Sequence, residues 1–156
     1  MPTPEFVLKL REKIGHDLLW LPGVTAVVFD GVGRVLLCQR ADTGHWTLIT
    51  GMLDPGEEPG PGTVREVLEE TGVVAEIEGL VAVHSQEAIE FPNGDKCQFL
   101  NLVFRGRAVA GEARVNDDES VAVGWFALDE LPELSGRHRQ RLQWALDYDG
   151  CTYFQR

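Results

Sequence analysis

Three glutamates at helical spacing carry the clearest chemistry in this sequence. Glu66, Glu69 and Glu70 stand at positions i, i+3 and i+4, so a helix through them would place all three on one face. Like charges at this spacing destabilise an exposed helix by about 0.2–0.5 kcal/mol per pair. A divalent cation would turn that repulsion into binding, and ligands that are all oxygen atoms suit Mg²⁺ or Mn²⁺. The spacing therefore predicts a metal site.

These glutamates belong to a longer pattern that runs from Gly51 to Val73. Within it, Glu57 follows a turn, Arg65 directly precedes Glu66, and Gly72 follows the run of glutamates. Written as G-x5-E-x7-R-E-U-x-E-E-x-G-U, with U an aliphatic residue, every fixed position is filled. The pattern resembles the Nudix box, which marks hydrolases that cut the pyrophosphate of a nucleoside diphosphate linked to another group.

The resemblance implies a role for each polar residue of the box. The metal ligands would be Glu57, Glu66, Glu69, Glu70 and the backbone carbonyl of Thr50. Bound Mg²⁺ would neutralise the diphosphate and lower the pKa of a water molecule, generating the nucleophile. Arg65 would hold Glu57 through a charge-assisted bond, with direct contact to phosphate as the alternative. Glu66 is also the candidate base in some members, so the division of roles among the carboxylates stays open.

A second point of resemblance lies beyond the box. The acidic run 116–120 precedes Trp125-Phe126 and the turn at Leu131-Pro132, an order that many Nudix proteins share. In several of them a glutamate of this loop completes the metal site or acts as general base, and Glu119 is the best match. The alternative is an acidic surface loop without a role in the reaction.

Two residues are candidates for contact with the substrate. Arg40 closes a predicted strand just before the loop into the box, and it could bind a phosphate or simply be a surface arginine. Phe91 lies in a predicted loop and could cap an open pocket. The basic run 137–141 is interpreted as the solvated face of the last helix, and the four histidines are assigned no chemistry.

Some positions depart from the usual family pattern. Ile49 and Thr50 stand where Pro-Gly is common, which puts the metal geometry in doubt. Ala88 occupies the place of a proline that marks ADP-ribose types, so the markers do not name the substrate. Two readings remain: a hydrolase acting on a nucleoside triphosphate or a nucleotide sugar/ADP-ribose type of compound, and a binding module that senses a nucleotide without cleaving it. The complete set of box carboxylates favours the hydrolase.

The box requires a helix with two faces. Pro61 or Gly62 is expected to begin it, and Gly72 to end it, because glycine tolerates the left-handed conformation common at helix ends. An apolar packing face is predicted opposite the glutamates, formed by Val64, Val67, Leu68 and Thr71.

The remaining elements are read from hydrophobic periodicity and turn residues. Helices are expected over 4–17 and, with Ser135 as N-cap, up to residue 147; strands are expected over 24–30, 34–40, 46–49, 73–86, 97–109 and 121–128. Together they predict a mixed α/β fold, which the resemblance specifies as a Nudix-type α/β/α sandwich around a mixed β-sheet. The chain is expected to be one Nudix domain, with an N-terminal helix and connector over 1–21, a core over 22–148 and the box over 51–73.

Composition limits the partners. The formal net charge of −11 in 156 residues argues against binding a nucleic-acid polymer, and an anionic nucleotide would need a cation at the carboxylates. Three widely spaced cysteines are interpreted as incidental thiols of a reducing cytosol. No leader pattern or membrane-spanning stretch is recognised, so a cytoplasmic location is expected. The apolar run 18–21 belongs either to the core or to the seam of a homodimer.

Overall fold

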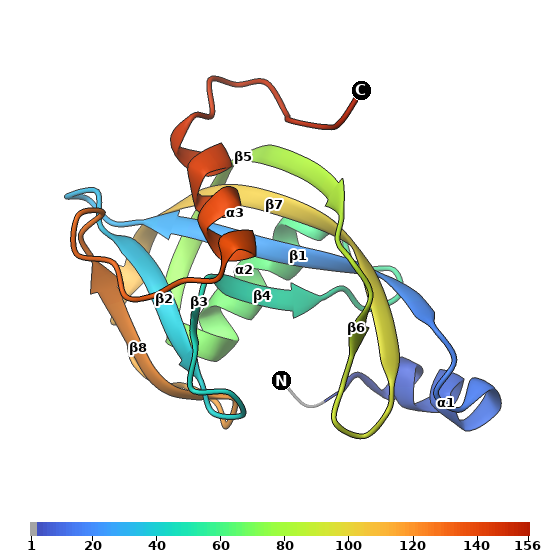
Figure 1. The fold of residues 1–156 in the computed structure, drawn as a ribbon. Helices are drawn as coiled ribbons and strands as arrows, with labels where there is room; N and C mark the ends of the chain where they lie inside the picture. Colours follow the sequence, from blue (N-terminus) through green and yellow to red (C-terminus); the bar gives the residue numbers. More distant parts are fainter. Residues whose placement is uncertain (1–2) are drawn as a thin grey trace.

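Figure 1 shows the computed structural model, which describes residues 3–156. Met1 and Pro2 of the predicted N-terminal segment lie outside the described residues. In chain order the elements are α1 (Glu5–Ile14), β1 (Leu19–Phe29), β2 (Val35–Arg40), β3 (Trp46–Thr47), β4 (Ile49–Met52), α2 (Pro59–Thr71), β5 (Val73–Ser85), β6 (Ile89–Glu90), β7 (Lys96–Gly111), β8 (Ser120–Phe126) and α3 (Gly136–Leu146).

A mixed sheet forms the centre of the molecule, as predicted. Its main path is β3-β2-β1-β7-β5, while β4 pairs with β1, β6 with β7 and β8 with β2. β1 and β7 run parallel to each other, from Leu19 opposite Cys97 to Phe29 opposite Arg107. The other pairs, such as β5 with β7, are antiparallel.

Helices α2 and α3 cover opposite faces of this sheet (Figure 1). Alternate residues of a strand point to opposite faces, and β1 follows this rule. Val27 packs in one core cluster with Leu142 and Ala145 of α3. Its neighbour Val28 packs in another cluster with Val67 of α2. The predicted α/β/α arrangement is therefore confirmed.

β1 begins earlier than the sequence suggested. Pro22-Gly23 was expected to separate an apolar run from a strand starting at Val24, but the strand starts at Leu19 and continues through both residues. Pairing with β4 begins only at Gly23, so the missing N–H of Pro22 costs β1 no hydrogen bond to that neighbour. Leu19 packs in the core around α1, whereas Trp20 is 58% exposed.

The box helix also begins earlier than expected, at Pro59 rather than at Pro61 or Gly62. Proline suits the first helical position because the N–H that it lacks has no partner within a helix there. The predicted end is confirmed, since Gly72 adopts the left-handed conformation with φ 70° and donates its N–H to the carbonyl of Leu68 at 2.9 Å.

The predicted separation of an apolar face from a glutamate face on α2 is wrong. Glu66 and Glu70 are buried together with Val67, whereas Leu68 is 44% exposed. The helix contacts β4 as well as β1 and β5, so its buried face is wider than one apolar stripe. Only Glu69 of the three glutamates faces solvent, with a side chain 45% exposed.

Local capping and turn chemistry follow the predictions elsewhere. The hydroxyl of Ser135 accepts a hydrogen bond from the N–H of His138, so Ser135 caps α3 as predicted. Asp30 closes the first hairpin by accepting hydrogen bonds from the N–H groups of Val32 and Arg34. None of the helices in the described part of the chain is both long and apolar enough to cross a membrane.

Candidate active site

A cavity of about 610 Å³ brings together residues from both sides of the sheet. Thr50 and Gly51 of β4 and the glutamates Glu66 and Glu70 of α2 line it. Arg40 at the end of β2, the loop that follows it and the first turns of α3 also line it. Two helices and the strands β2 and β4 thus place carboxylates and basic groups around one space.

Glu66 is the most buried carboxylate of the site, at 1% exposure. Its Oε1 lies 3.2 Å from Nη1 of Arg65, yet within residues 3–156 neither of its oxygens has a hydrogen-bond partner. A Cβ at Gly51 would come within 2.1 Å of the Glu66 Cδ, so only glycine allows β4 to pass this close. Burial raises the pKa of Glu66 to about 7, although Arg65 opposes the shift.

Glu70 lies one helical turn further along and is 4% exposed. Cys38 donates its thiol to Oε2 of Glu70 at 3.6 Å. Burial raises the pKa of Glu70 to about 8, and the nearby charges of Glu66 and Asp117 raise it further. Burial also raises the pKa of the Cys38 thiol to about 11, so this cysteine is a neutral donor. The carboxylates crowd one another in a buried space.

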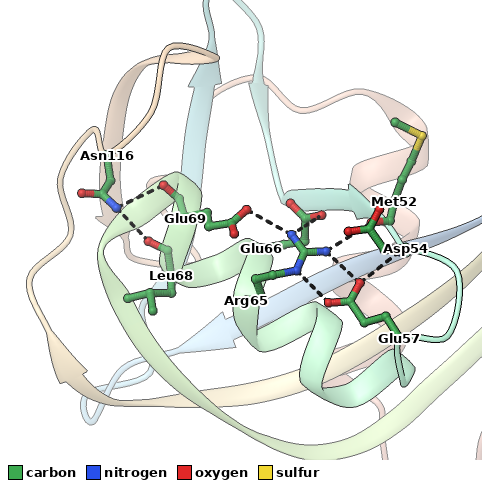
Figure 2. A network of polar contacts seen from close by, with 8 residues as sticks. All are labelled: Met52, Asp54, Glu57, Arg65, Glu66, Leu68, Glu69 and Asn116. Carbon is green, nitrogen blue, oxygen red and sulfur yellow. Dashed lines mark hydrogen bonds and ion pairs between the residues drawn. The ribbon is translucent and has the colours of Figure 1, made fainter. Parts of the chain in front are cut away.

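Arg65 links the loop and the helix of the box (Figure 2). Its Nε and Nη2 donate to the two oxygens of Glu57 at 2.7 and 2.8 Å, which is a bidentate pair. Its Nη1 also donates to Oε2 of Glu69 at 3.0 Å. The hydrogen bonds from Arg65 lower the pKa of Glu57, which keeps that carboxylate ionised. The expected contact between Arg65 and Glu57 is present, while its role in a reaction stays a prediction.

The acidic loop between β7 and β8 is fastened to the end of α2. The amide of Asn116 donates to the carbonyls of Leu68 and Glu69 at 3.0 and 3.2 Å, as Figure 2 shows. These carbonyls belong to the last turn of the helix, where few backbone partners are left, and the Leu68 carbonyl also accepts the N–H of Gly72. Because the loop is held there, Asp117 acts on the pKa of Glu70. Asp117 belongs to the acidic run 116–120, of which only Glu119 was predicted to take part in the site.

Two predicted site residues are bonded to each other. Nη1 of Arg40 donates to Oε2 of Glu119 at 3.3 Å, and both residues line the cavity. Arg40 also forms a bidentate pair with Asp42, with Nε–Oδ1 and Nη2–Oδ2 distances of 3.0 Å. The sequence predicted neither pair. A phosphate that binds Arg40 would therefore meet a guanidinium already shared by two carboxylates.

Aromatic side chains line part of the cavity. Phe91 is 42% exposed and lies along it, as its place in the turn after β6 suggested. Trp46 also lines the cavity and packs edge-to-face on Phe126, with ring centroids 4.8 Å apart. Trp125 packs against the core cluster beneath α2.

The interpretation of the basic run on α3 as a solvated face is wrong for two of its residues. His138 is 6% and Arg141 2% exposed, and both line the cavity. Their burial could have been predicted from helical spacing, because these two residues share the helical face of Leu142 and Ala145, which pack in the core. Gln86, at the end of β5, lines the same region and was also missed.

The residues fit a divalent cation by their chemistry. All the candidate ligands offer oxygen, and buried Glu66 has acceptor capacity that a cation would use: Arg65 lies 3.2 Å from its Oε1, and among residues 3–156 its Oε2 has no hydrogen-bond partner. Across residues 3–156, however, no three His, Cys, Asp or Glu side chains are gathered closely enough to hold a metal ion. Glu57 and Glu69 instead bond to Arg65. The oxygen ligands for a metal ion are present, but two of the carboxylates that supply them are hydrogen-bonded to Arg65.

Comparisons with known proteins agree with the fold and with the family that the sequence resembles. Residues 19–145 match the family model described as the NUDIX domain. The chain is 37% identical over 128 residues to a MutT-like protein of Streptomyces ambofaciens, covering 81% of this chain and 77% of that protein. It is 30% identical over 141 residues to an ADP-ribose pyrophosphatase of Methanocaldococcus jannaschii, covering 86% and 79%. A solved MutT NUDIX hydrolase from Burkholderia pseudomallei superposes with a TM-score of 0.67 at 33% identity, covering 81% of this chain and 98% of that one.

Proposed function

Because this chain belongs to the Nudix hydrolase family, we propose that it cleaves the pyrophosphate bond of a nucleoside diphosphate linked to another group, with the help of Mg²⁺ or Mn²⁺. The observation that supports this most is the buried Glu66 beside Gly51 in the cavity: Arg65 reaches its Oε1 at 3.2 Å, and its Oε2 has no hydrogen-bond partner among residues 3–156. A carboxylate is costly to bury unless a partner compensates its charge. We also take residues 1–156 as one Nudix domain with its core over 22–148.

The cation would be held by Glu66 and Glu70, with the Thr50 carbonyl, with Glu57 through the lone pairs that Arg65 leaves open and, once released from Arg65, with Glu69. When bound, the cation neutralises the diphosphate and lowers the pKa of a water molecule. Arg65 orients Glu57 through its bidentate pair and keeps that carboxylate ionised. Either Glu66 or Glu119 accepts the proton of the attacking water.

Substrate recognition uses the residues around the carboxylates. Arg40 contacts a phosphate, and its bond to Glu119 joins the substrate contact to a candidate base. Phe91 covers the open end of the cavity next to the substrate. A nucleoside triphosphate and a nucleotide sugar or ADP-ribose type of compound are the two substrate classes that we propose. The second class matches the name of the Methanocaldococcus jannaschii relative.

One observation favours an alternative function. Arg65 engages Glu57 and Glu69, so the carboxylates are not gathered around a metal position. A module that senses a nucleotide without cleaving it would not need the carboxylates to be gathered around a metal ion. The hydrolase and the sensing module both bind a nucleotide, so only a measurement of turnover distinguishes them.

A substrate panel with Mg²⁺ separates the two functions. The protein is incubated with nucleoside triphosphates, ADP-ribose, NADH and sugar nucleotides, and phosphate is followed after a phosphatase is added. Hydrolysis that disappears with EDTA and in Glu70→Gln supports the enzyme, provided that Glu12→Gln, an exposed change on α1, keeps full activity. Tight binding of one compound without turnover of any would establish the sensing module instead.

A further inference from the structure

Arg141 is a buried cation whose partners are neutral. It is 2% exposed, and its Nε donates to Nε2 of His84 at 3.3 Å while its Nη2 donates to Oε1 of Gln86 at 2.7 Å. His84 is neutral because burial, and then the charge of Arg141, lower its pKa. Among residues 3–156 no carboxylate forms an ion pair with Arg141, and no negative group raises its pKa.

This arrangement leaves a positive charge without compensation. Burial and, to a smaller extent, the neighbouring charge of Arg137 lower the pKa of Arg141 to about 10. The side chain is therefore still charged at neutral pH. Charges buried in proteins are normally paired, because the cost of removing them from water is otherwise not recovered. Since Arg141 lines the cavity, an anion that enters the cavity can supply the missing charge.

His138 provides a second, independent observation at the same place. It lies one helical turn before Arg141, is 6% exposed and lines the same cavity. Within the described residues its Nδ1 has no hydrogen-bond partner. Burial lowers the pKa of His138 to about 3, so the ring is neutral at physiological pH. A neutral imidazole that carries its proton on Nδ1 can donate that N–H to a ligand oxygen.

The cavity therefore has two sides of opposite character. Its acidic side includes Glu66 and Glu70 of α2, and its basic side includes Arg137, His138 and Arg141 of α3, although Glu133, which precedes α3, also lines the cavity. The two sides belong to different layers, because α2 and α3 cover opposite faces of the sheet (Figure 1). An anion can approach the acidic side only with a cation, whereas the basic side attracts it directly.

We propose that Arg141 and His138 form an anion subsite that binds a phosphate group of the substrate directly, without a metal ion. Gln86 and His84 fix the guanidinium of Arg141, so that its Nη1 edge remains for the ligand. The identification of the anion as part of a substrate rests on the proposed hydrolase function. Binding of phosphate at the subsite does not rest on it, and can be measured without turnover.

The test uses inorganic phosphate as the probe and EDTA to exclude metal ions. Thermal unfolding of the full chain is followed at rising phosphate concentration, with ionic strength held constant by chloride. The wild type is expected to gain roughly 3–6 °C at a phosphate concentration ten times the Kd. Arg141→Gln should lose this gain. Arg139→Gln, an exposed change on the same helix, should keep it.

The opposite result would overturn the subsite: a wild type without any gain, or an Arg141→Gln protein that gains as much as the wild type. Should Arg141→Gln fail to fold, Arg141→Lys retains the charge and is expected to retain part of the gain, while His138→Gln should reduce it. An inactive protein that still shows the phosphate-dependent gain would refute the proposed hydrolase and leave the subsite standing. For any compound that is turned over, Arg141→Gln should raise KM far more than it lowers kcat.

Discussion

Gly51 passes so close to Glu66 that a Cβ at residue 51 would lie 2.1 Å from the carboxylate carbon of Glu66. The position of the buried carboxylate is therefore defined by the backbone of β4 and not only by α2. The start of β4 departs from the common pattern at Ile49 and Thr50, but the close contact itself needs only the glycine. This relationship leads to the first prediction.

Gly51→Ala should displace Glu66 and weaken both stability and catalysis. The added methyl group overlaps a side chain that is 1% exposed, and overpacking of this kind costs about 1–3 kcal/mol. Denaturant unfolding and steady-state kinetics measure the two effects. Gly60→Ala is the matched control, because a Cβ there meets no atom within 4 Å and alanine favours the helix. If Gly51→Ala and Gly60→Ala behaved alike, the close contact would have no importance.

Arg65→Lys should weaken the binding of Mg²⁺ strongly while it destabilises the fold only slightly. Lysine keeps the charge but cannot make both hydrogen bonds that Arg65 makes to Glu57. Loss of a residue that orients a metal ligand typically costs 10–100-fold, so the Mg²⁺ concentration for half-maximal rate should rise by about that factor. Arg107→Lys, which alters an exposed ion pair with Glu76, serves as control. An unchanged Mg²⁺ requirement in Arg65→Lys would count against the orienting role.

Asn116 should be more sensitive to aspartate than to alanine. Asn116→Ala removes amide donors to the carbonyls of Leu68 and Glu69, a loss of about 0.5–1.5 kcal/mol. Asn116→Asp removes them too and adds a negative charge near the C-terminus of α2, where the helix dipole opposes it by about 0.3–1 kcal/mol more. Urea unfolding of both variants gives the order. Equal stability of the two variants would argue that the loop is held by other contacts.

His138 should make the protein lose stability in mild acid. Its pKa is about 3 in the folded protein, against 6.5 for an unburied histidine, so between these values the unfolded chain binds a proton that the folded chain does not. The free energy of unfolding therefore falls as the pH falls below 6.5, by about 1.4 kcal/mol per pH unit at most. Above pH 6.5 both states are neutral and the effect vanishes.

His138→Gln removes this titration. Comparing wild type with the variant by urea unfolding isolates it from the carboxylates, which titrate in both proteins. The difference in unfolding free energy should change by about 2 kcal/mol in favour of the variant between pH 6.5 and pH 5. A difference that stays constant over this range would show that His138 becomes protonated without unfolding.

Local chemistry accounts for the features that could be predicted from the sequence. Gly72 ends α2 and Ser135 caps α3 because these residue types satisfy the ends of helices in almost any surroundings. Short apolar runs between turn residues likewise predicted the strands that form the centre of the sheet. Each of these predictions needed only a few neighbouring residues.

What the sequence did not reveal depends on packing between distant elements. Whether Glu66 and Glu70 face solvent or a cavity is decided by β4, which lies beside α2 and widens its buried face. The bond between Arg40 and Glu119 joins two elements far apart in the chain. Burial of Arg141 similarly follows from the packing of Leu142 on the sheet, which a run of basic residues conceals.

The parallel pairing of β1 with β7 also determines when the site can form. β1 supplies the edge on which β4 pairs, yet its own long pairing partner begins only at Lys96, after the whole box has been made. Contacts between residues so distant along the chain close slowly, because the intervening loop must first lose its freedom. During synthesis, the residues of the box helix are therefore made before β7, the strand that pairs with β1. We expect the carboxylate cavity to assemble late in folding, because it also needs residues of α3, which follow β7.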